Sequence, residues 1–278
     1  MRYPSDLTDG EWALICPLLP AARRGGRRRS VDLRRVLEGL LYVLETGCQW
    51  RHLPKDFPPR STVWGCLDLW GYDGTLARIH EALYLALHEA AGREASPSAT
   101  ILDSQSVKSA EKWGLGGDPV GYDAGKKTQG IERHILVDTL GLMLWIVVHP
   151  ASVQDRDGAA LVLNRWTRRR FPFIKTVFAD QGYQGPKAEA AIARIGDWKL
   201  EIVRPDPGPK GFALLPKRWI VERTLSWIRR NRRLANDLEN LARMAEAFVI
   251  LTMSKITLRR LKNHDFTGQV LTNMDGLK

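Results

Sequence analysis

The chain has 278 residues, 44% of them hydrophobic, which is enough to bury a substantial core and predicts two domains. No apolar run reaches the roughly 18–20 residues that span a bilayer, and the basic N-terminus lacks the apolar core of a signal peptide, so we expect no membrane partner and a cytoplasmic location. The net charge of +11 predicts a polyanionic partner, whereas three cysteines without a Cys-x-x-Cys spacing and no clustered histidines predict reduced thiols and no zinc site.

Residues 1–92 are expected to form an all-helical domain. The segment Thr8-Asp-Gly-Glu11 is a capping box that opens a short helix, which ends at the prolines that follow. Three further helices are expected to start near Ser30, Ser61 and Leu76, the first of them ending at Gly47.

Two of these helices, joined by an irregular turn with basic residues nearby, are compatible with a helix-turn-helix DNA reader. A plain helical bundle that serves dimerisation or support fits the same residues equally well. If the domain binds DNA, Arg51 and Arg60 beside the third helix are candidate contacts, and a run that includes Arg27, Arg28 and Arg29 would track a phosphate backbone.

Residues 93–98 read as a linker, and the pattern beyond them alternates between strands and helices. The predicted order is that of an RNase H-like mixed sheet, with three antiparallel strands, a helix, and then alternating strands and helices. In this α/β (α+β) fold the first and fourth strands are neighbours. The predicted domain covers 99–262, and 263–278 are expected to be a disordered tail. The predicted strands lie at 99–107, 130–138, 142–149, before Asp180 and at 199–204, with a glycine-rich loop at 113–126 and helices at 155–170, 186–195, 218–234 and 239–262.

The helix expected at 218–234 has an unusual polar face. Its apolar residues fall on one broad side at 100° per residue, and the other side carries Glu222, Ser226, Arg229 and Arg233. One carboxylate therefore lies in a row of guanidinium groups. By itself, this pattern also describes a solvated face on which Glu222 pairs with its neighbours.

Two distant segments change that interpretation, because each is a short apolar run that ends in an aspartate, Asp103 or Asp180. A single aspartate at a strand end is commonly a turn former or a helix cap. Two on neighbouring strands, with a glutamate from a packed helix, would form a carboxylate cluster that repels itself unless divalent cations fill it. Such oxygen ligands suit Mg²⁺ or Mn²⁺, and two ions stabilise the attacking and leaving oxygens of a phosphodiester displacement.

The chain resembles a known family at these positions. The chain is similar to the bacterial DDE transposases of the insertion-sequence-five family in the order of three acidic residues, Asp103, Asp180 and Glu222. It also shares two segments with them, Phe178-Ala-Asp-Gln-Gly-Tyr183 and Val221-Glu-Arg-Thr-Leu-Ser-Trp-Ile-Arg-Arg-Asn-Arg-Arg-Leu234. The resemblance extends from Leu7 to about residue 261. In the family's Tyr-Arg-Glu-Lys signature, Arg218, Glu222 and Arg229 take the last three places, Arg229 replaces Lys, and Leu215 replaces Tyr.

This resemblance implies a transposase that binds the terminal inverted repeats of its element, cleaves DNA and transfers strands to target DNA, as a homodimer on double-stranded DNA at the nucleoid. Asp103, Asp180 and Glu222 would be both the catalytic residues and the ligands of two Mg²⁺ or Mn²⁺ ions. Two alternatives remain open, an inactive or domesticated DNA-binding regulator and an RNase H-like nuclease without sequence preference. The implied DNA contacts are Arg218, Arg229, Arg233, Lys126, Lys127, Arg27, Arg28, Arg29, Arg51 and Arg60.

Other polar residues admit simpler explanations. Asp138 falls in a predicted hairpin turn, which accounts for it without a metal, and His134 and His149 lie in strand-like runs where a structural role is the simpler interpretation. Lys126 and Lys127 follow the glycine-rich loop and could hold a phosphate, or could be ordinary solvated lysines.

Overall fold

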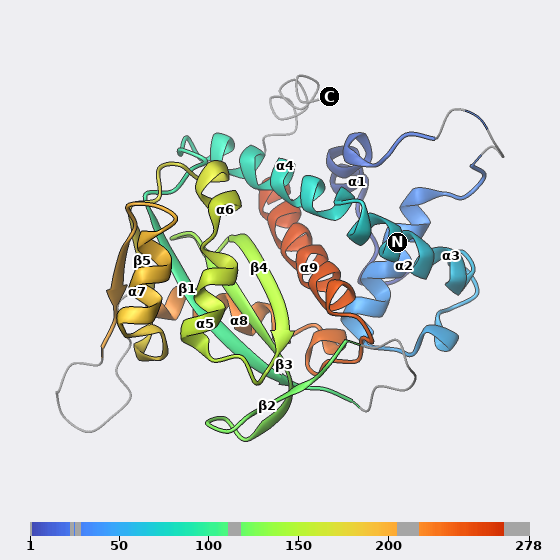
Figure 1. The fold of residues 1–278 in the computed structure, drawn as a ribbon. Coiled ribbons are helices and arrows are strands. Elements are labelled where there is room, and N and C mark those ends of the chain that lie inside the picture. Colours follow the sequence, from blue (N-terminus) through green and yellow to red (C-terminus); the bar gives the residue numbers. More distant parts are fainter. Residues whose placement is uncertain (1, 23–24, 26–28, 111–117, 205–216, 264–278) are drawn as a thin grey trace, which may run out of the picture. The chain divides into compact units, whose positions relative to one another are not determined.

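A computed structural model describes residues 2–22, 25, 29–110, 118–204 and 217–263 and divides the chain into two compact units (Figure 1). The helical unit contains Met1–Arg93, Arg230–Ala235 and the described residues from Arg243 onward. The sheet unit contains Glu94–Arg229 and Asn236–Ala242. Predicted tail residues 264–278, residues 113–117 of the glycine-rich loop, and Arg27, Arg28 and Leu215 lie outside the described residues.

The helical unit follows the start and stop signals of the sequence closely. The predicted capping box is confirmed, since the Thr8 hydroxyl accepts from the Glu11 amide and the Glu11 carboxylate accepts from the Thr8 amide. Asp32, not Ser30, caps the second helix, because its carboxylate reaches the Arg34 amide. The helices are α1 (Asp9–Ile15), α2 (Leu33–Thr46), α3 (Arg60–Tyr72), α4 (Thr75–Ala90) and α9 (Ala242–Asn263), with 3₁₀ turns η1 (Cys16–Leu18), η2 (Trp50–His52) and η4 (Arg232–Leu234).

Helix α9 belongs by its contacts to the helical unit, whereas the predicted segmentation placed it in the catalytic domain. Its buried positions fall on all sides of the helix, as expected for a helix enclosed by others. Within the unit, the Phe248 ring lies 6.3 Å from the Trp50 ring, and Lys255 forms an ion pair with Glu45. These long-range contacts decide where α9 packs, and its local sequence does not predict them.

The sheet unit has the mixed topology that the sequence predicted. Its strands are β1 (Ala99–Lys108), β2 (Gly121–Asp123), β3 (Thr128–Val137), β4 (Met143–Pro150), β5 (Thr176–Ala179) and β6 (Lys199–Ile202). They are ordered β2-β3-β1-β5-β6, with β4 paired to β3. Strand β1 pairs antiparallel with β3 and parallel with β5, so the first and fourth predicted strands are neighbours. Strand β2, inside the predicted glycine-rich loop, was not anticipated.

Helices cover both faces of this sheet, with α5 (Asp155–Val162) and α8 (Arg218–Arg229) on opposite sides (Figure 1). The helix predicted at 155–170 is two helices, α5 and α6 (Arg165–Arg170), because Asn164 caps a new start. Helix α8 ends at Arg229, short of the predicted 234. A 3₁₀ turn, η3 (Gln181–Tyr183), follows β5, and α7 (Pro186–Ala193) precedes β6. Among the described helices, none is long and apolar enough to cross a membrane.

Candidate active site

Asp103 and Asp180 lie at matching positions on two adjacent parallel strands. The ladder between β1 and β5 ends at the pair Ile101 and Phe178, and each aspartate is two residues beyond its member of that pair. Side chains alternate between the two faces of a sheet, so both aspartates leave the sheet on the same face. Since the Ser104 hydroxyl donates to Asp155 of α5, its neighbour Asp103 lies on the opposite face, against which α8 packs.

Glu222 reaches this face because α8 is anchored to the hairpin between β3 and β4. The Thr224 hydroxyl lies 2.8 Å from the Gly141 carbonyl oxygen, and the Arg223 guanidinium donates to the Leu140 carbonyl at 3.0 Å. Thr224 is fully buried, and Gly141 adopts φ 78°, where a Cβ would lie 2.8 Å from the Thr224 hydroxyl. A glycine is therefore required at this turn for α8 to approach.

Arg218 joins two of the three carboxylates. Its guanidinium lies 3.4 Å from Asp180 and, one helical turn along α8, 3.2 Å from Glu222. Asp103, at 7% exposure, is the most deeply buried of the acids, whereas the Glu222 side chain is 49% exposed.

The electrostatics of Asp103 reflect this crowding. Its pKa is raised from 3.8 to about 7, chiefly by burial and in addition by the negative charges of Asp180 and Glu222, against the opposing effects of the Ser104 amide hydrogen bond and Arg218. A buried carboxylate held beside two others lacks enough positive charge to ionise easily. The three oxygen donors therefore fit divalent cations, which would supply that charge.

The predicted basic residues have different surroundings. Arg229 is exposed on α8, and among the described residues it has no ion-pair partner. Lys127 is exposed with φ 50°, whereas Lys126 contacts the Glu132 carboxylate at 2.7 Å. Arg29, Arg51 and Arg60 are exposed in the helical unit.

Arg233 departs from the prediction of DNA contact. It is 7% exposed in the helical unit, where its guanidinium lies over the rings of Trp50 and Phe248 and near the Cys48 carbonyl oxygen. Because α8 ends at Arg229, Arg233 does not continue the polar helix face. Arg233 is therefore buried against aromatic rings of the helical unit and is not an exposed DNA contact.

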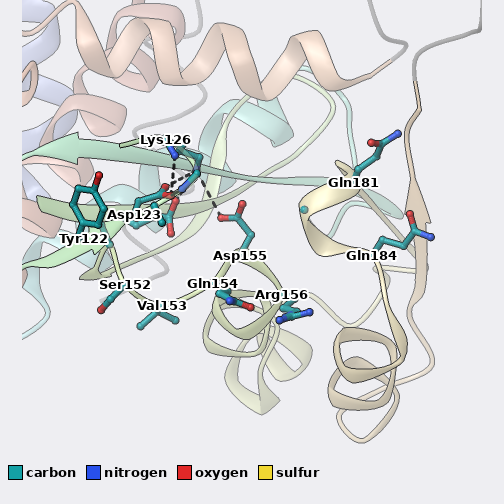
Figure 2. A pocket seen from close by; sticks show the side chains of 15 residues that line it. Tyr122, Asp123, Lys126, Ser152, Val153, Gln154, Asp155, Arg156, Gln181 and Gln184 are labelled. Carbon is teal, nitrogen blue, oxygen red and sulfur yellow. Dashed lines mark hydrogen bonds and ion pairs between the residues drawn. The ribbon is translucent and has the colours of Figure 1, made fainter. Parts of the chain in front are cut away.

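The sequence did not reveal a polar network on the face of the sheet opposite Asp103. The Lys126 ammonium lies 3.2 Å from the Ser104 hydroxyl, in addition to its contact with Glu132. It also lies 3.8 Å from Asp155 (Figure 2). Burial raises the pKa of Asp155, and the Glu132 charge adds to that effect. Lys126, Glu132 and Asp155 line a pocket of about 560 Å³ that also includes Gln181 and Gly182, directly after Asp180. No short sequence motif joins these residues, which come from β1, the β2–β3 connection, β3 and α5.

Asp138 has the turn role that its position predicted. Its carboxylate accepts hydrogen bonds from the Leu140 and Leu142 amides, both at 2.8 Å, and its carbonyl accepts from Gly141. These bonds fix the hairpin on which α8 rests.

Comparison with known proteins gives matches over most of the chain. Residues 94–254 match the family model of the transposase DDE domain, and residues 7–80 match a model for transposases of the IS4/5 family. The chain is also similar to an uncharacterized 16.2 kDa protein of insertion element IS402 from Burkholderia cepacia, with 36% identity over 108 residues that cover 37% of this chain and 72% of that protein. No solved structure matches the chain.

Proposed function

Because the chain belongs to the transposase DDE domain family, we propose that it cleaves the ends of its insertion sequence and joins them to target DNA, acting at the nucleoid. The observation that carries this proposal is the meeting of Asp103, Asp180 and Glu222 on one face of the sheet, at the positions where the family resemblance predicts the catalytic acids.

In this proposal, Asp103, Asp180 and Glu222 hold two Mg²⁺ or Mn²⁺ ions. When bound, such ions make a water or a DNA 3′-hydroxyl more acidic and stabilise the leaving 3′ oxygen. Asp103 provides the rigid ligand, because it is buried on the central strand β1, whereas the half-exposed Glu222 has room to adjust. Arg218, already placed between Asp180 and Glu222, is within reach of a phosphate at the same site and would neutralise its charge.

DNA binding is expected to involve both units. Exposed Arg229 and Lys127 in the sheet unit suit phosphate contacts, and exposed Arg29, Arg51 and Arg60 suit contacts by the helical unit, which we propose reads the terminal inverted repeats. Arg27 and Arg28 remain proposed contacts of the same run. Action as a homodimer on DNA would bring two element ends together.

The direct test is to replace Asp103, Asp180 and Glu222 singly by alanine. Each change should abolish cleavage and joining while leaving binding to an end-containing duplex nearly intact, because the carboxylates serve metal rather than DNA. Glu189→Ala, which removes an exposed carboxylate of α7, is the matched control and should react normally. Since the three acids act as one unit, double variants should lose no more than single ones.

The same assays separate the alternatives. Retained strand transfer in one alanine variant would remove that residue from the site. A wild-type protein that binds ends but never cleaves them would indicate a DNA-binding regulator. Equal cleavage of terminal-repeat and random DNA in competition would instead indicate a nuclease without sequence preference.

A further inference from the structure

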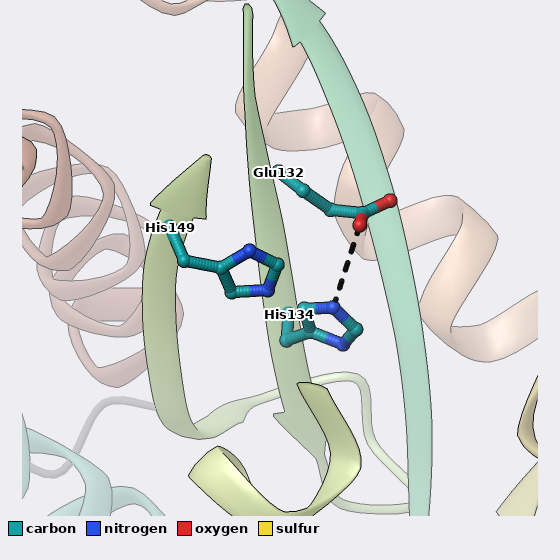
Figure 3. Close-up of side chains that lie close together, drawn as sticks. All are labelled: Glu132, His134 and His149. Carbon is teal, nitrogen blue, oxygen red and sulfur yellow. Dashed lines mark ion pairs between the residues drawn. The ribbon is translucent and has the colours of Figure 1, made fainter. Parts of the chain in front are cut away.

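A second group of potential ligands lies on the other face of the sheet from Asp103. Glu132 on β3 is directly opposite His149 on β4 in the antiparallel register, and His134 is two residues further along β3 on the same face. Figure 3 shows the two imidazole rings and the carboxylate converging from the two strands. One ligand atom from each side chain lies within 4.8 Å of the others.

All three side chains are buried, and two of them have a nitrogen without a hydrogen-bond partner among the residues that the structure describes. Glu132 is 2% exposed, His134 0% and His149 7%. The Nε2 atoms of both histidines are buried, and within the described part of the chain neither has a hydrogen-bond partner. The His134 Nε2 atom lies 3.6 Å from the nearer Glu132 oxygen, beyond hydrogen-bond distance. A buried polar atom without a partner is costly, so two of them in one cluster call for an explanation.

The partners of the remaining nitrogens leave those Nε2 atoms available. The His149 Nδ1 atom lies 2.9 Å from the Pro150 carbonyl oxygen, an acceptor only, so Nδ1 carries the proton and Nε2 carries a lone pair. The His134 Nδ1 atom lies 2.8 Å from the Tyr183 hydroxyl. Such hydrogen bonds to the non-ligating nitrogen are what orients a metal-binding histidine.

The charges of the cluster also suit a cation. The Lys126 ammonium lies 2.7 Å from one oxygen of the Glu132 carboxylate, and this contact favours the ionised carboxylate. Lys126 and Ser106 contact the Oε1 atom of Glu132, which leaves Oε2 facing His134.

We propose that Glu132, His134 and His149 form a binding site for one divalent transition-metal ion of the zinc type, separate from the carboxylates Asp103, Asp180 and Glu222. Two imidazoles and one carboxylate favour Zn²⁺ over Mg²⁺, which prefers oxygen ligands. Two ligand atoms on one tetrahedral zinc ion lie about 3.3 Å apart, so side-chain movements of about 1 Å would close the site.

Gly158 of α5 maintains the space beside His134. A Cβ atom at this position would lie 2.2 Å from the His134 Nε2 atom. The glycine therefore allows α5 to cover the cluster while the nitrogen that would bind the metal remains free.

Zinc binding to the full-length, chelator-treated protein tests the proposal, measured by competition with a chromogenic chelator. One Zn²⁺ per chain is expected for the wild type. His149→Gln and Glu132→Gln should each weaken binding by at least about 100-fold, since loss of an outer-shell partner alone costs 10–100-fold. His52→Gln, which removes an exposed histidine, and Glu222→Ala, which alters the catalytic carboxylates, should bind zinc as the wild type does.

Several outcomes would overturn the proposal. These are the absence of stoichiometric binding, unchanged binding in both His149→Gln and Glu132→Gln, loss of binding in Glu222→Ala, or a sulfur-to-metal band in the Co²⁺ complex that identifies cysteine ligands. If His149→Gln does not fold, the nearly isosteric Glu132→Gln decides. Because Glu222→Ala should lose DNA joining but keep zinc, failure of this proposal is distinguishable from failure of the proposed function.

Discussion

Replacing Asp103 by asparagine should stabilise the metal-free protein at alkaline pH. Asp103 is 7% exposed, and burial together with the charges of Asp180 and Glu222 raises its pKa from 3.8 to about 7. Asparagine preserves the shape and can still accept the Ser104 amide hydrogen bond at 2.8 Å, but it carries no charge at any pH. The substitution therefore removes the cost of ionising this carboxyl in the folded protein.

The direction follows from proton linkage. Folded Asp103 binds its proton more tightly than unfolded Asp103. The contribution of this group to stability is therefore fully present below its unfolded pKa of 3.8 and is lost as the pH rises through about 7. A pKa displaced by about 3 pH units, at about 1.4 kcal/mol per unit, limits the effect to about 4 kcal/mol. Asp103→Asn should approach that advantage at about pH 8.5 and lose it near pH 4, where the wild-type carboxyl is protonated.

Urea denaturation of both proteins in the presence of a chelator, followed at several pH values, measures this difference. Saturating Mg²⁺ should stabilise the wild type at alkaline pH far more than the variant, because the cation compensates the charge that the variant lacks. Glu201→Gln, which removes an exposed carboxylate, is the control and should change stability by less than about 0.5 kcal/mol at every pH. A stability difference for Asp103→Asn that does not vary with pH would refute the reasoning.

Three further predictions concern the anchoring of α8, the DNA contacts and the helical unit. Thr224→Val should destabilise the protein by about 1–2 kcal/mol in thermal unfolding, because it leaves the Gly141 carbonyl without the Thr224 hydroxyl donor. Ser226→Ala removes an exposed hydroxyl from the same helix and should be nearly neutral. Equal effects of the two substitutions would contradict the role of Thr224 in anchoring α8. Arg229→Ala should lower the rate of single-turnover joining more than the affinity for DNA, and the slope of log affinity against log salt concentration should change by only about one unit. Arg229→Lys should have a smaller effect. A normal joining rate in a less stable protein would assign Arg229 a structural role. A fragment of residues 1–92 should show little cooperative unfolding because it lacks α9, and a fragment in which a linker adds residues 243–263 should unfold cooperatively. A cooperative transition in the short fragment would show that the helical unit folds without α9.

The sequence alone determined the elements whose signals are local. Thr8 and Glu11 reveal a helix start within four residues, Gly47 a helix end, and the alternation around Asp138 a hairpin, all of which the structure contains. The strand order followed from the succession of these elements, and it correctly predicted that β1 and β5 are adjacent. Asp103 and Asp180 could be identified because each ends a short apolar run, and Glu222 because it lies in an amphipathic helical segment. All three positions resemble those of a known family.

Tertiary structure decided what depends on contacts between distant residues. No local pattern in the sequence predicts that α9 packs with the helical unit or that Arg233 is buried there. The same holds for Arg218, which lies between Asp180 and Glu222 because of electrostatic attraction in the folded protein. The pairing of Glu132 with His149 depends on the register of β3 and β4, because a shift by one residue would send the two side chains to opposite faces. Local propensity specifies where a strand lies in the chain, but only its pairing in the folded sheet specifies which side chains meet.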